Sequence, residues 1–112
     1  MDAAILGVTG DLNYSGSNST DVLTLNANSS IGGNINVNAG NGSNQADLLG
    51  VLGGTSVKYT GGDGADNVTF GTTGTPADVN VKLKSGDDVF VLEAGAAVAT
   101  DSLRVDFGGG DD

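Results

Sequence analysis

Residues 61–69 read Gly61-Gly62-Asp63-Gly64-Ala65-Asp66-Asn67-Val68-Thr69. This stretch fits the nonapeptide pattern G-G-x-G-x-D-x-U-x at every specified position, with Val68 as the large apolar residue U. Short repeats of this kind are typical of stacked parallel β-structures. Degenerate copies of the same turn recur along the chain, and together they predict an architecture.

The 112-residue chain is strongly acidic, with 14 acidic and 4 basic residues and a net charge of −10. Nearly all the acidic residues are Asp, which favours turns, whereas the helix formers Glu, Lys and Arg are scarce. With 20 Gly residues, this composition indicates strands joined by turns. The acidity argues against nucleic acid and anionic membranes as partners, and it favours cations.

The chain contains neither Cys nor His. Their absence excludes disulfides, thiol chemistry, histidine acid–base catalysis and the usual zinc ligands. We expect no enzymatic activity, although paired carboxylates are still available as an acid and a base. No apolar segment reaches transmembrane length, so membrane insertion is not expected either.

A single pattern of apolar residues recurs around a series of Asp anchors. Around Asp66, Val57 and Tyr59 lie nine and seven residues before the anchor, and Val68 and Phe70 lie two and four residues after it. These residues alternate with polar ones, as in half-buried strands. The predicted anchors are separated by 26, 19, 22 and 24 residues and are Asp21, Asp47, Asp66, Asp88 and Asp112.

The repeating unit is a strand, a Gly/Asp turn, a second strand and a longer loop. The loops are expected at residues 26–34, 51–56, 71–78 and 93–102. Before Asp47 the preceding strand residues, Ile35 and Val37, lie further back, which predicts an insertion in that turn. A unit of this length corresponds to one coil of a solenoid.

The sequence thus predicts an all-β fold in which residues 1–112 form one parallel β-solenoid domain, similar to a β-helix or β-roll, of four to five coils. The alternative is an antiparallel β-sandwich in which each Gly/Asp turn closes a hairpin. Two observations favour the solenoid. The anchor-relative pattern repeats, and the turns are longer than tight two-residue hairpin turns.

Residues 61–69 resemble the haemolysin-type (RTX) calcium-binding repeats. The chain as a whole resembles, more loosely, bacterial surface β-strand-repeat proteins. The resemblance implies that Asp66 is a carboxylate ligand, that Gly61, Gly62 and Gly64 shape a turn with backbone ligands, and that Val68 is the core anchor. True members stack nonapeptides in tandem with calcium turns on both sides of each coil, whereas here only one side carries such turns.

Stacking gives a separate reason to expect calcium. Neighbouring strands lie about 4.8 Å apart, so equivalent Asp residues form a column of like charge that a divalent cation would stabilise. The alternative is that Gly and Asp only make turns, with Asp accepting backbone N–H groups and no metal. The predicted calcium ligands are Asp21, Asp47, Gly61, Gly62, Asp63, Gly64, Asp66, Asp87, Asp88, Asp111 and Asp112.

The sequence favours an extracellular or cell-surface repeat protein, structural or adhesive, with calcium-stabilised turns. It is expected either to be a piece of a longer repeat protein or to stack head to tail into fibres through its open ends. The alternative is a carbohydrate-binding or carbohydrate-cleaving β-helix whose basic residues Lys58, Lys82 and Arg104 face an anionic polysaccharide. Tyr14 and Tyr59 fall on inward positions, which argues against an exposed sugar platform.

Overall fold

The computed structural model describes residues 2–4, 7–52, 56–71, 76–96 and 103–112, and in these ranges it contains strands and no helix. Every pairing between these strands is parallel. The strands are β1 (Asp2–Ala4), β2 (Gly7–Val8), β3 (Leu12–Ser15), β4 (Val22–Leu25), β5 (Ser30–Ile31), β6 (Ile35–Asn38), β7 (Gln45–Leu48), β8 (Val51–Leu52), β9 (Ser56–Thr60), β10 (Asn67–Phe70), β11 (Asp78–Lys82), β12 (Val89–Leu92) and β13 (Leu103–Asp106).

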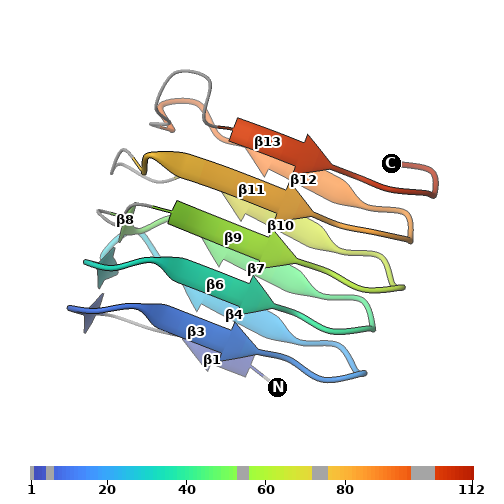
Figure 1. Cartoon of the computed structure of the whole chain (residues 1–112), viewed down its shortest axis with the longest axis horizontal. Coiled ribbons are helices and arrows are strands. Elements are labelled where there is room, and N and C mark those ends of the chain that lie inside the picture. The colour runs from blue at the N-terminus through green and yellow to red at the C-terminus, as the bar shows by residue number, and fades with distance from the viewer. Residues whose placement is uncertain (1, 5–6, 53–55, 72–75, 97–102) are drawn as a thin grey trace.

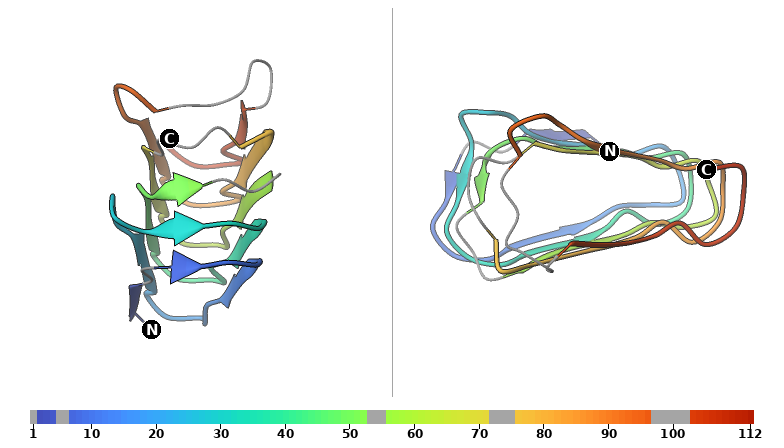
Figure 2. Two further views of the ribbon diagram at one scale, coloured as in Figure 1. Left: turned by 90° about the vertical axis from the view of Figure 1, so that its left-hand side faces the viewer. Right: turned by 90° about the horizontal axis from the view of Figure 1, so that it is seen from above.

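Three parallel sheets run along the axis of a β-solenoid (Figures 1 and 2). Sheet A has the order β1-β4-β7-β10-β12, sheet C the order β3-β6-β9-β11-β13, and the short sheet B the order β2-β5-β8. Each coil passes from sheet A to sheet C, and a Gly/Asp turn leads back to the next strand of sheet A. The predicted parallel solenoid is confirmed, and the antiparallel sandwich is wrong.

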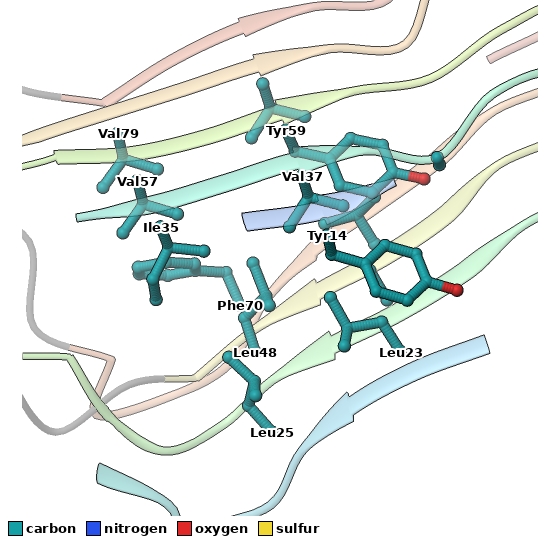
Figure 3. Packing of buried hydrophobic residues seen from close by; sticks show 14 of the residues in the cluster. Tyr14, Leu23, Leu25, Ile35, Val37, Leu48, Val57, Tyr59, Phe70 and Val79 are labelled. Atoms are coloured by element: carbon teal, nitrogen blue, oxygen red, sulfur yellow. The ribbon is translucent and has the colours of Figure 1, made fainter. Parts of the chain in front are cut away.

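Side chains alternate between the interior and the surface, so equivalent apolar residues form rows along the axis. In sheet A, Leu25, Leu48 and Phe70 form one such row and are completely buried. In sheet C, Tyr14, Val37 and Tyr59 form another. Figure 3 shows these rows facing each other across the narrow interior. Burying each large apolar side chain stabilises the fold by about 1.5–3 kcal/mol, so this alternation holds the coils together.

The last strand of sheet A is the exception. Leu92 continues the row of Leu25, Leu48 and Phe70, yet 48% of its surface is exposed. The outward residues Val89 and Val91 of the same strand are also exposed, by 48% and 42%. Among the described strands, β12 has a sheet neighbour on one side only, so these side chains lack the cover that a further strand supplies elsewhere.

Two predicted loops contain additional short strands. Residues 26–34 include β5, and residues 51–56 include β8; with β2 they form sheet B, a third side of the first three coils. A two-residue strand is too short for alternation to reveal it. Residues 53–55, 72–75 and 97–102 of the predicted loops lie outside the described residues.

Candidate functional site

Five turns follow the strands of sheet C and stack along one edge of the solenoid (Figure 1). We number them turn 1 to turn 5, at residues 16–21, 39–44, 61–66, 83–88 and 107–112. Strand register fixes their equivalent positions, because Gln45 pairs with both Val22 and Asn67, and Asn67 pairs with Val89. The last residues of the turns, here called the anchors, are Asp21, Asn44, Asp66, Asp88 and Asp112.

The prediction that Asp47 anchors a turn is wrong, and so is the predicted insertion. Asp47 lies within β7 and pairs with Thr24 and Thr69 on the outward-facing row. Its carboxylate accepts a hydrogen bond of 2.9 Å from Gln45 Nε2. Asn44 occupies the anchor position, which makes the repeat more regular than the Asp residues alone indicated.

The anchors form a continuous hydrogen-bonded ladder along the axis. The backbone N–H of each anchor donates to the side-chain Oδ1 of the next. The lengths are 3.1 Å from Asp21 to Asn44, 3.1 Å from Asn44 to Asp66, 2.8 Å from Asp66 to Asp88 and 3.1 Å from Asp88 to Asp112. Each buried N–H therefore has its acceptor on the following coil, as buried backbone donors require.

The second δ atom of the side chain distinguishes the anchors. In turn 1, Asp21 Oδ2 accepts hydrogen bonds from the backbone N–H (2.5 Å) and the hydroxyl (3.2 Å) of Ser17. In turn 2, Asn44 Nδ2 donates to the carbonyl oxygens of Gly40 (3.1 Å) and Gly42 (3.0 Å), and to Asp66 Oδ1 (2.9 Å). These two anchors thus use opposite chemistry, one accepting and the other donating.

The second oxygens of Asp66 and Asp88 are buried and have no hydrogen-bond partner. Both residues are only 1% exposed. Burial raises the pKa of the Asp66 carboxyl, against the hydrogen bonds from Asn44 and the backbone N–H of Gly62 that lower it, and the charge of Asp88 raises it further. A buried carboxylate oxygen without a donor is destabilising, so a cation beside these oxygens would stabilise the fold.

Tyr59 places a further polar atom in this region. Its hydroxyl is buried without a hydrogen-bond partner, and Figure 3 shows its ring pointing in the same direction as that of Tyr14. Burial raises the pKa of the Tyr59 hydroxyl, and the charges of Asp66 and Asp88 add to the rise. The hydroxyl therefore stays protonated and neutral inside the solenoid.

The turn backbones have two conformations. In turn 2, Gly40 and Gly42 have φ values of +79° and +106°. In turn 4, Lys84 and Gly86 have +77° and +138°, and turn 5 repeats the pattern at Gly108 and Gly110. At the same places in turns 1 and 3, no residue has a positive φ. The two conformations present different backbone groups to the anchor, as the contrast between Asp21 and Asn44 demonstrates.

The other acidic residues predicted as ligands lie at the outer side of the turns. Asp63, Asp87 and Asp111 are exposed, and Asp87 Oδ1 accepts a hydrogen bond of 3.0 Å from the backbone N–H of Asp111. Among the described residues, no group of three or more acidic side chains is placed to hold a metal ion. A calcium ion here would therefore need backbone carbonyl oxygens beside one or two carboxylates, which is within its usual ligand chemistry.

The three glycines predicted to shape the turn at residues 61–66 are needed because a side chain at any of them would collide with neighbouring atoms. A side chain at Gly61 would place its Cβ 1.8 Å from Asp66 Oδ2, and one at Gly62 would meet the carbonyl oxygen of Gly40 at 2.4 Å. At Gly64, the contact would be with Gly42 O at 2.3 Å. Only glycine fits these three positions without displacing the Asp66 side chain or the backbone of the neighbouring coil.

A second ladder, which the sequence did not suggest, lies where the chain enters sheet C. Asp11 Oδ1 accepts the backbone N–H of Asn34 at 2.8 Å, and Asn34 Oδ1 accepts that of Ser56 at 3.1 Å. Here the acceptor belongs to the preceding coil, opposite to the anchor ladder. The only signal in the sequence is the near-equal spacing of Asp11, Asn34 and Ser56, at 23 and 22 residues.

Comparisons with protein-family models, with curated proteins and with solved structures found no match to this chain. The described residues include no helix long and apolar enough to cross a membrane. The candidate site therefore rests on the geometry of the turns themselves.

Proposed function

We propose that this chain is a structural or adhesive repeat module of an extracellular or cell-surface protein, with turns that calcium stabilises. The observation that carries the proposal is the buried, unpartnered Oδ2 of Asp88. Asp88 stands between Asp66 and Asp112 of the adjacent coils, which are about 4.8 Å apart, so ionised carboxylates in this column repel one another. A divalent cation would replace this repulsion by attraction.

A structural role agrees with how the interior is used. Apolar rows fill it, and no cleft or pocket is present in the part of the chain that the structure describes. The geometry that repeats from coil to coil lies in the backbone ladders and in the turns, which fix the shape of the solenoid. We propose no enzymatic activity for this module.

Self-association through the solenoid ends is part of the proposal. β12 has a free edge and exposes Leu92 together with Val89 and Val91. A second copy that stacked its first coil on this edge would cover Leu92 and continue the sheets. The expected observation is growth of molar mass with protein concentration in light scattering. Strict monomer behaviour at high concentration, with and without calcium, would count against fibre formation.

The test of calcium stabilisation is thermal unfolding of EDTA-stripped protein, followed by circular dichroism, with and without millimolar calcium. A cation that binds only the folded state raises the melting temperature as its concentration exceeds Kd. Magnesium at equal ionic strength is the control, because it prefers a smaller, octahedral site that keeps water. Equal melting temperatures in calcium, magnesium and EDTA would remove the metal from the proposal.

A second candidate function is binding of an anionic polysaccharide to the outward face of sheet C. Lys58 and Arg104 flank Asn80 in one outward row, and Lys82 lies on the neighbouring row. The basic side chains are exposed, and Asn80 Oδ1 is covered without a hydrogen-bond partner. Against this function, Tyr14 and Tyr59 are buried, so they offer no stacking platform.

Affinity electrophoresis through polygalacturonate, with neutral dextran as control, tests this second function. Salt-sensitive retardation by polygalacturonate that is lost in Lys58→Gln/Arg104→Gln would support it. Equal mobility in both polymers would exclude it. Release of reducing ends from polygalacturonate would support cleavage rather than binding alone.

A further inference from the structure

The amide of Asn44 occupies a position surrounded by oxygen atoms. Its Nδ2 lies 3.1 Å from Gly40 O, 3.0 Å from Gly42 O and 2.9 Å from Asp66 Oδ1. Two carbonyl oxygens from one turn and a carboxylate oxygen from the next are the kind of ligands that a hard cation takes. In turn 2 these oxygens are satisfied by the protein's own N–H donors.

Turn 4 repeats the backbone of turn 2 but not its donor. Lys84 has φ +77° where Gly40 has +79°, and Gly86 is left-handed like Gly42. The ladder bond is also repeated, because Asp88 N–H donates to Asp112 Oδ1 at 3.1 Å.

In turns 2 and 4 the Oδ1 atom of the anchor accepts the ladder hydrogen bond. The remaining δ atoms are therefore equivalent: Asp88 has an oxygen, Oδ2, where Asn44 has its amide nitrogen, Nδ2. The oxygens that correspond to those around the Asn44 amide are Lys84 O, Gly86 O and the Asp112 carboxylate. Asp88 Oδ2, which is buried and without a partner, therefore lacks the donor that turn 2 provides.

Turn 3 contains the most complete calcium motif but has the other conformation. A Cβ at Gly61 would lie 1.8 Å from Asp66 Oδ2, and a Cβ at Gly16 would lie 2.5 Å from Asp21 Oδ2. Turn 4 has Leu83 at this position, so Asp88 Oδ2 cannot lie there. Turn 3 thus resembles turn 1. In turn 1 the backbone N–H and hydroxyl of Ser17 satisfy the carboxylate, and in turn 3 the backbone N–H of Gly62, at the place of Ser17, interacts with the Asp66 carboxylate.

We propose that the calcium site of this chain lies between turns 4 and 5, and that Asn44 is a built-in replacement for such an ion between turns 2 and 3. Asp88, Asp112 and the carbonyl groups of Lys84 and Gly86 would hold the ion. Lys84 O also accepts the backbone N–H of Gly109 at 2.8 Å, so the ion would use the second lone pair of this oxygen. This inference rests on the proposed function, since it says which turn calcium acts on. The exposed carboxylates of Asp87 and Asp111 add negative charge at the same place. Coils 1 to 3 then need no metal.

Isothermal titration of calcium into the 112-residue protein, with thermal unfolding of the same samples, tests this assignment. We expect one calcium per chain, with a dissociation constant on the order of 10⁻⁴ to 10⁻³ M, as for weak extracellular modules. Asp88→Asn supplies an amide as in turn 2. It should lose calcium binding and melt at a higher temperature than the wild type in EDTA. Asp66→Asn is the matched control and should keep the calcium ion.

Asn44→Asp tests the second half of the inference. It should bind one calcium more than the wild type and melt at a lower temperature in EDTA. If it does not fold without metal, its refolding on addition of calcium, measured by circular dichroism, is the readout. No additional ion and no calcium-dependent refolding would overturn the role assigned to Asn44.

The outcomes separate this inference from the proposed function. Loss of calcium binding in Asp66→Asn but not in Asp88→Asn would overturn the assignment to turn 4, while calcium stabilisation itself would stand. A wild type that binds no calcium would overturn both.

Discussion

The backbone N–H of Asp66 donates a hydrogen bond of 2.8 Å to Oδ1 of Asp88, one coil further along the axis. The two oxygens of the Asp88 carboxylate thus have unequal surroundings. Oδ1 is fixed by the ladder, whereas Oδ2 is buried without a donor. The Asp88 side chain therefore joins two coils and also destabilises the fold through its buried, unpartnered oxygen. Asp66 has the same two features, because its Oδ1 accepts the backbone N–H of Asn44 and its Oδ2 is buried without a hydrogen bond.

The burial of the Asp66 carboxylate makes the stability of the metal-free protein depend on pH. The folded state raises the pKa of Asp66 above its ordinary value of 3.8, chiefly through burial. Between the raised pKa and 3.8, the folded protein binds more protons than the unfolded chain, so its stability increases as the pH falls. We expect urea midpoints in EDTA to rise as the pH falls through this window.

Asp66→Asn is the control for the pH dependence, because it removes this titrating group and keeps the acceptor oxygen for Asn44 N–H. The slope of stability against pH should be smaller in the variant. An equal slope in both proteins would assign the pH dependence to the other carboxylates and not to Asp66.

Removing the side chain of Asn44 should be costly. Asn44→Ala leaves the buried N–H of Asp21 without its acceptor and deprives Gly40 O, Gly42 O and Asp66 Oδ1 of a donor. Unsatisfied buried groups cost about 1–3 kcal/mol each, so we expect a loss of about 3 kcal/mol in the free energy of unfolding. Asn36→Ala, on an exposed strand position, should change it by less than about 0.5 kcal/mol. Similar losses in both variants would contradict the ladder's role.

Lys84→Gly should stabilise the protein. Lys84 is the one residue other than glycine with a positive φ in the described ranges, at +77°. The left-handed conformation costs a residue with a Cβ about 1–2 kcal/mol, and we expect the variant to recover about 1 kcal/mol, measured by chemical denaturation. In Lys82→Gly, on strand β11, the same replacement should instead lower stability by about 0.5–1 kcal/mol. A loss of stability in Lys84→Gly would show that the Lys84 side chain contributes more than its backbone costs.

Two leucines of one inward row should differ widely in their contribution. Leu48 is completely buried, whereas Leu92 is 48% exposed. Leu48→Ala should lower the free energy of unfolding by about 2–5 kcal/mol, since it leaves a cavity in the packed row. Leu92→Ala should cost less than about 1 kcal/mol at a protein concentration where the chain is monomeric. A large effect at Leu92 under these conditions would show that the last coil is covered in solution.

Strand alternation and the repeating turn were sufficient to predict the solenoid, because inward rows such as Leu25–Leu48–Phe70 depend only on side-chain periodicity. The error at Asp47 arose from requiring a carboxylate at every anchor. Gly40-Asn41-Gly42-Ser43-Asn44 repeats the G-x-G-x-D spacing of residues 62–66 with Asn in place of Asp. An amide and a carboxylate both offer the Oδ1 that the ladder needs, so the ladder accepts either residue.

The conformations of the turns could not be predicted from residue type. A lysine with a positive φ contradicts the usual preference for glycine. Contacts along the axis hold it there: Lys84 O accepts the backbone N–H of Gly109 at 2.8 Å, and Ser85 N–H donates to Gly62 O at 3.1 Å. Stacking on both sides therefore decides the local backbone, and no single turn contains that information.

The direction of the anchor ladder has a consequence for how the chain acquires its shape during synthesis. Each anchor N–H finds its acceptor 22 to 24 residues further along the chain. When a turn leaves the ribosome or a secretion channel, its anchor N–H therefore has no acceptor until the next turn has also emerged. Folding should advance one coil behind the growing or translocating end, and the most recently emerged coil is always the incomplete one.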